Sequence, residues 1–352
     1  MNQPVAQIEN VNAVAFDNKR WQEELRQLGS LEKCRFPASS EIEIGGTQEL
    51  ATITMKKKGL NANMQSDPAA FEAWALALLI HCRVKSVQIS VDPEAVDVDT
   101  KGGHYQRFLY RLTRFSELFP GQVIAKLPAA PSRALDAQSG RFFNQSDPRS
   151  ELTEADFRER MKAASLPKKS ENGLELALEI SKAFKSRFRL DKVMRQWPVG
   201  LFDGEVKRGR EIFTRGKSAI DLIGVRGDTL VLFELKKAGN RKVGAVSELL
   251  FYASVMRDAI GASPIFKFLS SEASDNCAIG PEDILHCSKI CAVSLAPNFH
   301  PLIEEPQMFA VLNSAMKRLY SDRPISFETA TITDYPKDEN GDFKFSDDQS
   351  KN

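Results

Sequence analysis

Asp221, Glu234 and Lys236 are the residues of this chain whose types and spacing are best suited to chemistry. Asp221 lies in one short apolar run, and Glu234 and Lys236 close the apolar run that follows it. Side chains alternate across a strand, so Glu234 and Lys236 face one side and Leu235 faces the other. Two acids and one base are therefore expected on a single face of a mostly apolar hairpin.

A short turn joins the two runs and predicts antiparallel pairing between them. With a four-residue turn at 226–229, Val225 stands opposite Leu230, and the same register sets Asp221 opposite Glu234. Residues opposite each other in such a pair have Cβ atoms roughly 5 Å apart. The two carboxylates are thus expected to be near enough to share one ligand.

A buried pair of carboxylates needs a compensating charge, because like charges repel and lose their hydration on burial. A hard divalent cation supplies that charge, and Mg²⁺ or Mn²⁺ takes oxygen ligands. Asp221 and Glu234 are the candidate ligands, with the carbonyl of Leu235 as a further one. Lys236 would then orient or deprotonate the attacking water, or offset charge on a phosphate. The alternative is a structural ion pair between Glu234 and Lys236, which we favour less because it leaves like charges buried.

The pattern resembles the PD-(D/E)xK nuclease superfamily, which includes restriction endonucleases, exonucleases and repair nucleases. Ile220-Asp221, the hairpin, Glu234-Leu235-Lys236 and the helix after them carry the resemblance. Ile220 stands where many members have a proline before the aspartate, as is common in the RecB-like and NucS-like branches.

The resemblance covers residues 170–333, and its specific motifs are confined to 221–252. It implies a restriction-endonuclease-like fold in which Asp221 and Glu234 bind the metal and Lys236 is the catalytic lysine. The implied reaction is Mg²⁺-dependent hydrolysis of a nucleic-acid phosphodiester, with DNA favoured over RNA. Restriction, phage defence or repair is the implied setting, by fold analogy alone.

Helix residues add further candidates on the strength of the resemblance. Many members carry an acid or amide and a tyrosine after the lysine strand, where this chain has Glu248 and Tyr252. Without the resemblance, Glu248 is a solvated helix residue and Tyr252 is core, and both interpretations stay open. Many members also take a metal ligand from the first helix, where Glu171 and Glu175 are the better candidates and Glu179 competes with them.

A basic stretch leads into the Asp221 strand. Residues 185–217 hold ten basic and four acidic side chains, a net charge of 10 − 4 = +6. Such a stretch is suited to tracking a phosphate backbone, although a solvated surface is also basic in places.

The predicted fold class is α/β, with a C-terminal mixed sheet flanked by helices and a smaller N-terminal α/β domain. The predicted helices are 71–82, 104–119, 174–188, 246–260 and 307–320. The predicted strands are 87–91, 218–225, 229–237, 290–295 and 325–333. The predicted boundaries are an N-terminal domain at 1–126, a loop-rich linker at 127–169, the nuclease-like domain at 170–335 and a polar tail at 336–352. Asp67-Pro68 is predicted to cap the first of these helices.

Bulk properties predict a cytoplasmic protein. Of 352 residues, 42% are hydrophobic and 27% charged, and the net charge is +1. The longest apolar run, 73–80, is too short to cross a bilayer, so no membrane partner is expected. Five cysteines, an odd number, favour a reducing compartment over a disulfide framework. Buried thiols explain His286, Cys287 and Cys291 better than a zinc site, because no second ligand pair has a familiar spacing.

Two rival functions compete with an autonomous nuclease. One is a non-catalytic nucleic-acid-binding or scaffolding module that retains the fold, which the intact acidic and basic set disfavours. The other is a nuclease that acts only when a protein partner binds the N-terminal domain.

Overall fold

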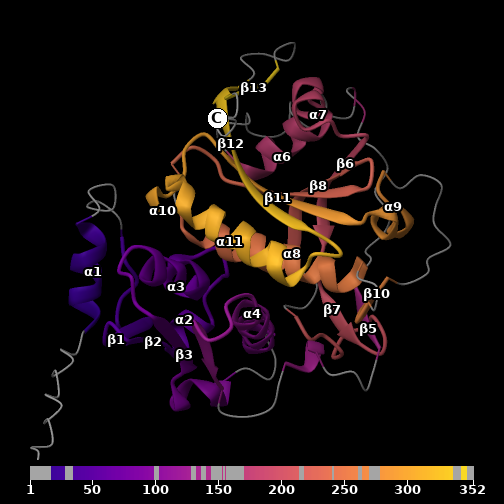
Figure 1. Ribbon diagram of the computed structural model, residues 1–352. Helices are drawn as coiled ribbons and strands as arrows, with labels where there is room; N and C mark the ends of the chain where they lie inside the picture. The colour runs from indigo at the N-terminus through magenta and orange to yellow at the C-terminus, as the bar shows by residue number, and fades with distance from the viewer. Residues whose placement is uncertain are drawn as a thin grey trace, which may run out of the picture.

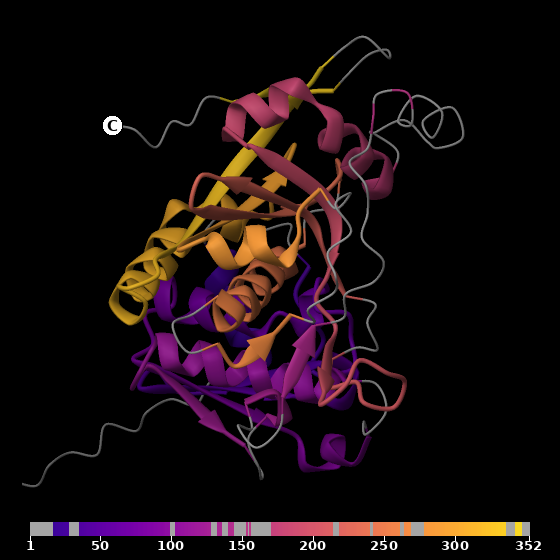
Figure 2. The ribbon, with the colours of Figure 1, turned by 90° about the vertical axis from the view of Figure 1, so that its right-hand side faces the viewer.

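The computed structural model describes residues 17–27, 35–98, 103–127, 132–135, 140–143, 153, 155, 170–213, 218–239, 242–260, 264–268, 278–335 and 342–346. These residues form a mixed α/β protein with three mixed sheets, which confirms the predicted fold class. Figures 1 and 2 show the large C-terminal sheet with helices on both of its faces, and the N-terminal sheet beyond the helices of one face.

The large sheet belongs to the C-terminal half and has the strand order β13-β12-β11-β9-β8-β6. Its strands are β6 Lys192–Pro198, β8 Ala219–Arg226, β9 Thr229–Leu235, β11 Lys289–Ala296, β12 Ile325–Asp334 and β13 Lys344–Phe345. β9, β11 and β12 run parallel, and the other neighbours pair antiparallel. β9 and β11 lie inside the sheet and are buried on both faces, which explains their nearly continuous apolar sequences.

Helices α6 (Glu171–Ile180) and α7 (Lys182–Phe188) cover one face of this sheet, where Phe184 packs against Phe233. The prediction of one helix at 174–188 is wrong. Ser181 leaves the helical conformation and begins α7, its hydroxyl accepting a hydrogen bond from the Phe184 N–H at 3.0 Å. A serine favours this break because its side chain replaces a lost helical hydrogen bond.

Helices α8 (Gly244–Ile260) and α11 (Pro306–Leu319) cover the opposite face. The predicted strands and helices of this half, apart from 174–188, are confirmed to within two residues at each end. The structure adds β6, in a stretch without a clear pattern, and the short helices α9 (Pro281–His286) and α10 (Pro301–Glu304). None of the helices described here is long and apolar enough to cross a membrane.

The N-terminal half builds a four-stranded sheet in the order β1-β2-β3-β4. Its strands are β1 Ile42–Gly46, β2 Leu50–Met55, β3 Ser86–Val91 and β4 Val123–Lys126, and its helices are α1 Asn18–Arg26, α2 Lys57–Leu60, α3 Phe71–Ile80 and α4 His104–Leu118. α3 is buried along most of its length because it packs between this sheet and the helices of the other half. A helix that is apolar all round is typical of such a position.

The two halves share one hydrophobic core, and their backbones pack tightly at the start of α8. A side chain added at Gly244 would lie 2.2 Å from the carbonyl oxygen of Gln65. The predicted cap at Asp67 is wrong, because Asp67 lies in the separate 3-10 turn Asp67–Ala69. Its carboxylate instead accepts a hydrogen bond from the Val243 N–H at 3.0 Å and so caps α8 across the interface.

The region expected to be a linker contributes to a third sheet. Its strands are β5 Arg141–Phe143, β7 Leu201–Asp203 and β10 Phe266–Lys267. The 3-10 turn Arg133–Leu135 belongs to the same region. Most of the remaining residues of 127–169 lie outside the described ranges, as does the greater part of the predicted tail.

Candidate metal and catalytic site

The hairpin of β8 and β9 has the register expected from the sequence. Val225 pairs with Leu230, and the pairing extends to Leu222 opposite Phe233. The turn is tighter than expected, because Arg226 and Thr229 still pair and only two residues connect them. In this register Asp221 and Glu234 are the next residues on their strands.

Asp221 itself bonds to the backbone of the neighbouring strand. One of its carboxylate oxygens accepts a hydrogen bond from the Leu235 N–H at 2.8 Å. Its side chain is partly exposed, and it lies at the end of the regular hairpin pairing. The bond fixes the carboxylate beside the end of β9, where Glu234 and Lys236 follow.

Lys236 joins two carboxylates that come from different elements. Its ammonium donates to Oε1 of Glu234 and to Oε2 of Glu248, the latter at 3.1 Å. Glu248 comes from the second turn of α8. The three residues are 4%, 2% and 6% exposed, so this contact is a buried one. The structure thus brings Glu248 into the predicted cluster, in the position that the sequence left open.

Within the described residues, no N–H or O–H donor reaches the buried Oε2 of Glu234. The Glu234 carboxyl group does interact with that of Glu248, a contact that helps to raise its pKa. Ser294 on β11 pairs in register with Glu234, and its buried hydroxyl oxygen also has no partner there. Buried oxygens are normally hydrogen-bonded, so two such atoms on adjacent strands indicate a position for water or a cation.

The electrostatics of the cluster follow from burial and crowding. Burial raises the pKa of Asp221 to about 8, and the charges of Glu175 and Glu248 add to the rise while Lys236 opposes it. Burial, followed by the charge of Asp221, raises the pKa of Glu234 well above its ordinary value. Burial disfavours the charged form of Lys236, but the neighbouring carboxylates outweigh it and raise its pKa. Two carboxyl groups contact the ammonium and Asp221 interacts with its charge, so the ionised cluster carries excess negative charge that a proton or an added cation would neutralise.

The donor set fits a hard divalent cation. Asp221 and Glu234 offer carboxylate oxygens. Leu235, the last residue of β9, directly follows Glu234 and offers a carbonyl oxygen. Mg²⁺ and Mn²⁺ take such ligands and keep water in the remaining positions. Among the described residues no group of three or more His, Cys, Asp or Glu side chains is arranged to hold a metal. An ion here would therefore rely on two carboxylates, the carbonyl and water.

Tyr252 lies one turn beyond Glu248, and its hydroxyl contacts the backbone of β8 rather than Lys236. Its hydroxyl donates to the carbonyl oxygen of Ala219 at 3.0 Å, and its ring is buried. Burial is the main cause that raises the pKa of Tyr252 well above its ordinary value. Ala219 stands two residues before Asp221, so Tyr252 fixes the start of β8 against α8.

The glutamates of α6 form a side cluster. Glu175 is buried, and its Oε2 accepts from Nε2 of Gln196 at 2.7 Å. Burial raises the pKa of Glu175 to about 7. Arg195 pairs with Glu179, to which its backbone N–H donates at 3.1 Å, and its Nη1 also lies 3.9 Å from Oε2 of Glu175. Glu171 is partly exposed, and its charge adds to the rise in the pKa of Glu175. Of the three, Glu175 interacts electrostatically with Asp221.

Gln196 is a site residue that the sequence reasoning missed. It stands on β6 between the pairs Arg195 with Leu222 and Trp197 with Ile220, and so opposite Asp221. Its φ of +55° is left-handed, which is uncommon for a residue with a side chain. Such strain gathers at functional sites, where the surrounding structure enforces it. The only sequence signal was two polar residues inside the apolar run of β6.

Two lysines of the basic stretch are paired with acids in the described residues. Lys192 pairs with Asp283 at 2.8 Å, and Lys207 pairs with Glu205 at 2.5 Å. The exposed arginines are distributed over the end of α7 and the segment after β7: Arg189, Arg208 and Arg210. Arg215 and Lys217, which lead into β8, lie outside the described residues.

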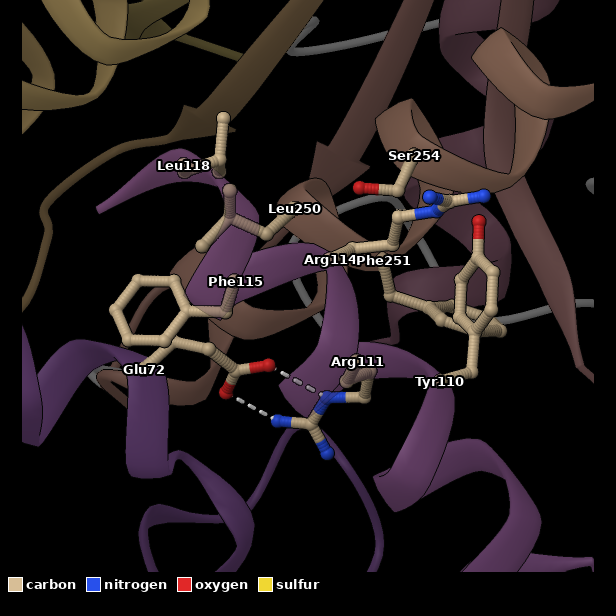
Figure 3. Close-up of a pocket in the computed structure, with 9 residues that line it drawn as sticks. All are labelled: Glu72, Tyr110, Arg111, Arg114, Phe115, Leu118, Leu250, Phe251 and Ser254. Carbon is tan, nitrogen blue, oxygen red and sulfur yellow. Dashed lines mark hydrogen bonds and ion pairs between the residues drawn. The ribbon is translucent and has the colours of Figure 1, made fainter. Parts of the chain in front are cut away.

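A second buried charge cluster lies against α8, one residue before Glu248. Arg111 donates through Nε to Oε1 of Glu72 at 2.7 Å and through Nη2 to Oε2. The Ser247 hydroxyl donates to the same carboxylate at 2.7 Å, and Arg111 also donates to the Ala69 carbonyl at 2.8 Å. We call Glu72, Arg111 and Ser247 the interface clamp, part of which Figure 3 shows. The cavity beside it has a volume of about 10 Å³, room for at most one water.

Comparison of the chain with protein-family models, with curated proteins and with solved structures found no match in any of the three.

Proposed function

We propose that this protein is a metal-dependent nuclease that hydrolyses phosphodiester bonds of nucleic acid, with DNA favoured. The observation that carries the proposal is the buried Oε2 of Glu234, which no N–H or O–H donor of the described residues reaches, within a cluster of three carboxyl groups and one ammonium. A structural ion pair needs one carboxylate for one ammonium, whereas here Lys236 is shared by Glu234 and Glu248, with Asp221 close by. As part of this proposal, the protein is a nuclease of the PD-(D/E)xK type.

The residues divide the work by position. Asp221 and Glu234 would hold Mg²⁺ through their free carboxylate oxygens, with the Leu235 carbonyl as a further ligand. When bound, the ion polarises the phosphoryl oxygen and makes its water a better nucleophile. The Leu235 N–H keeps Asp221 in place by its 2.8 Å hydrogen bond.

Lys236 would act beside this pair as a hydrogen-bond donor. In the structure it is a hydrogen-bond donor held between Glu234 and Glu248. The same donor can orient an attacking water or bind a phosphate oxygen as charge develops on it. Glu248 would hold the ammonium beside Glu234 through its 3.1 Å contact. Tyr252 would hold the start of β8 against α8 through its hydrogen bond to Ala219.

The test is cleavage of labelled single-stranded and double-stranded DNA with Mg²⁺, with Mn²⁺ and with a chelator. Wild type is compared with Asp221→Asn and Glu234→Gln, and with Glu205→Gln as a control that removes an exposed acid outside the cluster. We expect metal-dependent cleavage that both site variants lower by at least about 10³-fold and the control leaves unchanged. Cleavage that survives both site variants would contradict the proposal.

A partner-activated nuclease is the second candidate. The observation in its favour is that Glu234, Lys236 and Glu248 are nearly closed off from solvent. On this account the isolated chain binds Mn²⁺ through Asp221 but cuts nothing, and a protein bound at the N-terminal half opens the site. Cleavage by the isolated chain would rule this candidate out.

A further inference from the structure

Arg107 is a buried cation without a counter-ion. It belongs to α4, in the N-terminal half, and is 5% exposed. Its guanidinium hydrogen-bonds to the Ser218 hydroxyl at 3.4 Å and to Nδ1 of His104 at 3.2 Å. Within the described parts of the chain it forms no ion pair with a carboxylate. Both of its partners are neutral or weakly basic groups, so neither compensates its charge.

The acids nearest to Arg107 are already engaged elsewhere. Glu248 pairs with Lys236, and Glu72 pairs with Arg111 and accepts from Ser247. Burial, with the charge of Arg111 as the second cause, lowers the pKa of Arg107 to about 10, so it keeps its proton at neutral pH. A buried charge without an ion-pair partner is unfavourable, and such charges are rare outside functional sites.

Arg107 lies close to the strand that carries Asp221. Ser218 directly precedes β8 and stands three residues before Asp221. The charge of Arg107 interacts with Tyr252 and Glu248, which places it on the α8 side of the site.

The two hydrogen-bond partners of this guanidinium reach the surface, although Arg107 itself is buried. His104 and Ser218 are both partly exposed, as is Asp221. These partners set the guanidinium between the first turn of α4 and the residue before β8. That first turn carries no acidic residue. The positive end of a 15-residue helix adds to the favourable potential for a negative group.

We propose that Arg107 binds a backbone phosphate of the nucleic acid, next to the phosphodiester that the Asp221 and Glu234 pair acts on. This inference rests on the proposed function and adds a substrate-binding residue from the N-terminal half. A guanidinium matches phosphate because its fork of N–H donors engages two oxygens at once, and each terminal nitrogen of Arg107 has a second N–H to offer. The N-terminal half thus supplies part of the substrate site as well as a clamp on α8.

The first arm of the test uses inorganic phosphate as the probe. Melting temperatures of wild type, Arg107→Gln and Arg107→Lys are measured in chelator, in phosphate and in chloride of equal ionic strength. Lys85→Gln serves as a control that removes an exposed positive charge from the same half. We expect phosphate to stabilise wild type and the control, with an apparent affinity about 10-fold weaker in Arg107→Gln. Arg107→Lys keeps the charge but not the fork, so it covers the case in which Arg107→Gln does not fold, and we expect a smaller loss.

A structural role for Arg107 predicts a different result. In chloride, a structural arginine would make Arg107→Gln melt well below wild type. We expect it to melt at or above wild type, because a buried unpaired charge is removed. Equal phosphate stabilisation in wild type and both Arg107 variants, or none in wild type, would overturn the inference.

The second arm separates this inference from the proposed function. Binding of a labelled oligonucleotide is followed by fluorescence anisotropy in chelator over a range of salt concentrations. We expect Arg107→Gln to bind about 10-fold more weakly, with a salt slope smaller by about 0.7 to 0.9. Equal oligonucleotide binding by wild type and Arg107→Gln would overturn the Arg107 inference and leave the nuclease proposal standing. Loss of phosphate binding in Arg107→Gln, with no oligonucleotide bound by either protein, would instead support an anion site and contradict the nuclease proposal.

Discussion

Two buried charge clusters flank neighbouring residues of α8, and they differ in how completely they are satisfied. In the interface clamp, Glu72 receives hydrogen bonds from Arg111 and Ser247, and Arg111 also stacks 4.7 Å from the ring of Phe71. In the site, by contrast, no N–H or O–H donor of the described part of the chain reaches Oε2 of Glu234, and carboxyl groups outnumber the ammonium. Burial of charge alone therefore does not mark a functional site. The mark is burial that the fold leaves unsatisfied.

The clamp should respond to charge removal by losing stability, and this is the largest effect we expect. Glu72→Ala leaves the Arg111 guanidinium buried and unpaired, so the free energy of unfolding should fall by about 3–5 kcal/mol. Glu234→Gln in the site should leave the free energy of unfolding in chelator unchanged or raised, because it relieves crowding. Urea unfolding of both variants measures the contrast.

A double variant guards that comparison against a simple packing defect. Glu72→Leu with Arg111→Met replaces the pair by apolar side chains and should recover most of the lost stability. If the double variant is as unstable as Glu72→Ala, or if Glu234→Gln is the less stable of the two single variants, the two clusters do not differ as described.

Substitutions at Glu248 and Ser247, neighbouring residues of α8, test whether the two clusters act independently. Glu248→Gln removes the charge that holds Lys236 at 3.1 Å while keeping the shape of the side chain. We expect the rate of cleavage to fall about 10- to 100-fold, as for other residues that position a reactive group. Ser247→Ala, one residue away in the clamp, should change the melting temperature but not the cleavage rate. A rate loss in Ser247→Ala equal to that in Glu248→Gln would show that the two clusters act as one.

The pH dependence of stability should also separate the site from the clamp. The folded-state pKa of Asp221 is raised from 3.8 to about 8, so the folded protein binds extra protons between these values. The free energy of unfolding contributed by this group therefore falls as pH rises from about 4 to about 8. Asp221→Asn lacks this titration, so in chelator its melting temperature should rise relative to wild type across that range.

Divalent cation reverses the trend, because it binds the ionised carboxylates. The rise in melting temperature that Mg²⁺ causes in wild type should grow with pH and be small in Asp221→Asn. A difference between the two proteins that does not change with pH would contradict the raised pKa of Asp221.

The smallest effect concerns backbone strain on the site side. Gln196 has a φ of +55°, a conformation that glycine adopts without cost. Gln196→Gly and Gln196→Ala both lose the hydrogen bond to Glu175, but only alanine retains the strain. We expect the glycine variant to be more stable by about 1 kcal/mol in urea unfolding. The opposite order, which is normal inside a regular strand, would show that β6 is unstrained at this position.

The sequence predicts the centre of the site because its geometry is local. Asp221, Glu234 and Lys236 lie on one hairpin, where strand alternation and a short turn fix their relation. The α8 helix follows within a few residues, so the placement of Glu248 was within reach. The main helices and strands of the C-terminal half were predictable for the same reason, since their periodicity is strong.

The remainder of the site depends on contacts between distant segments. Gln196, Ser294 and Arg107 reach it from β6, β11 and α4, and no short-range pattern relates them to Asp221. Ser294 has one sequence signal, because it is the single hydroxyl residue within a buried apolar strand. Asp67 shows the reverse error, because a local cap was expected where a tertiary one forms. Propensity and spacing cannot choose between such partners, since tertiary packing decides.

The central claim is that the unsatisfied carboxylates of the site take a divalent cation. Calorimetric titration of wild type with Mn²⁺, beside Glu234→Gln and the exposed control Glu205→Gln, tests it most directly. We predict saturable binding to wild type and to the control, and an affinity at least about 10-fold weaker in Glu234→Gln. Equal Mn²⁺ binding by wild type and Glu234→Gln, or no binding by wild type, would contradict it.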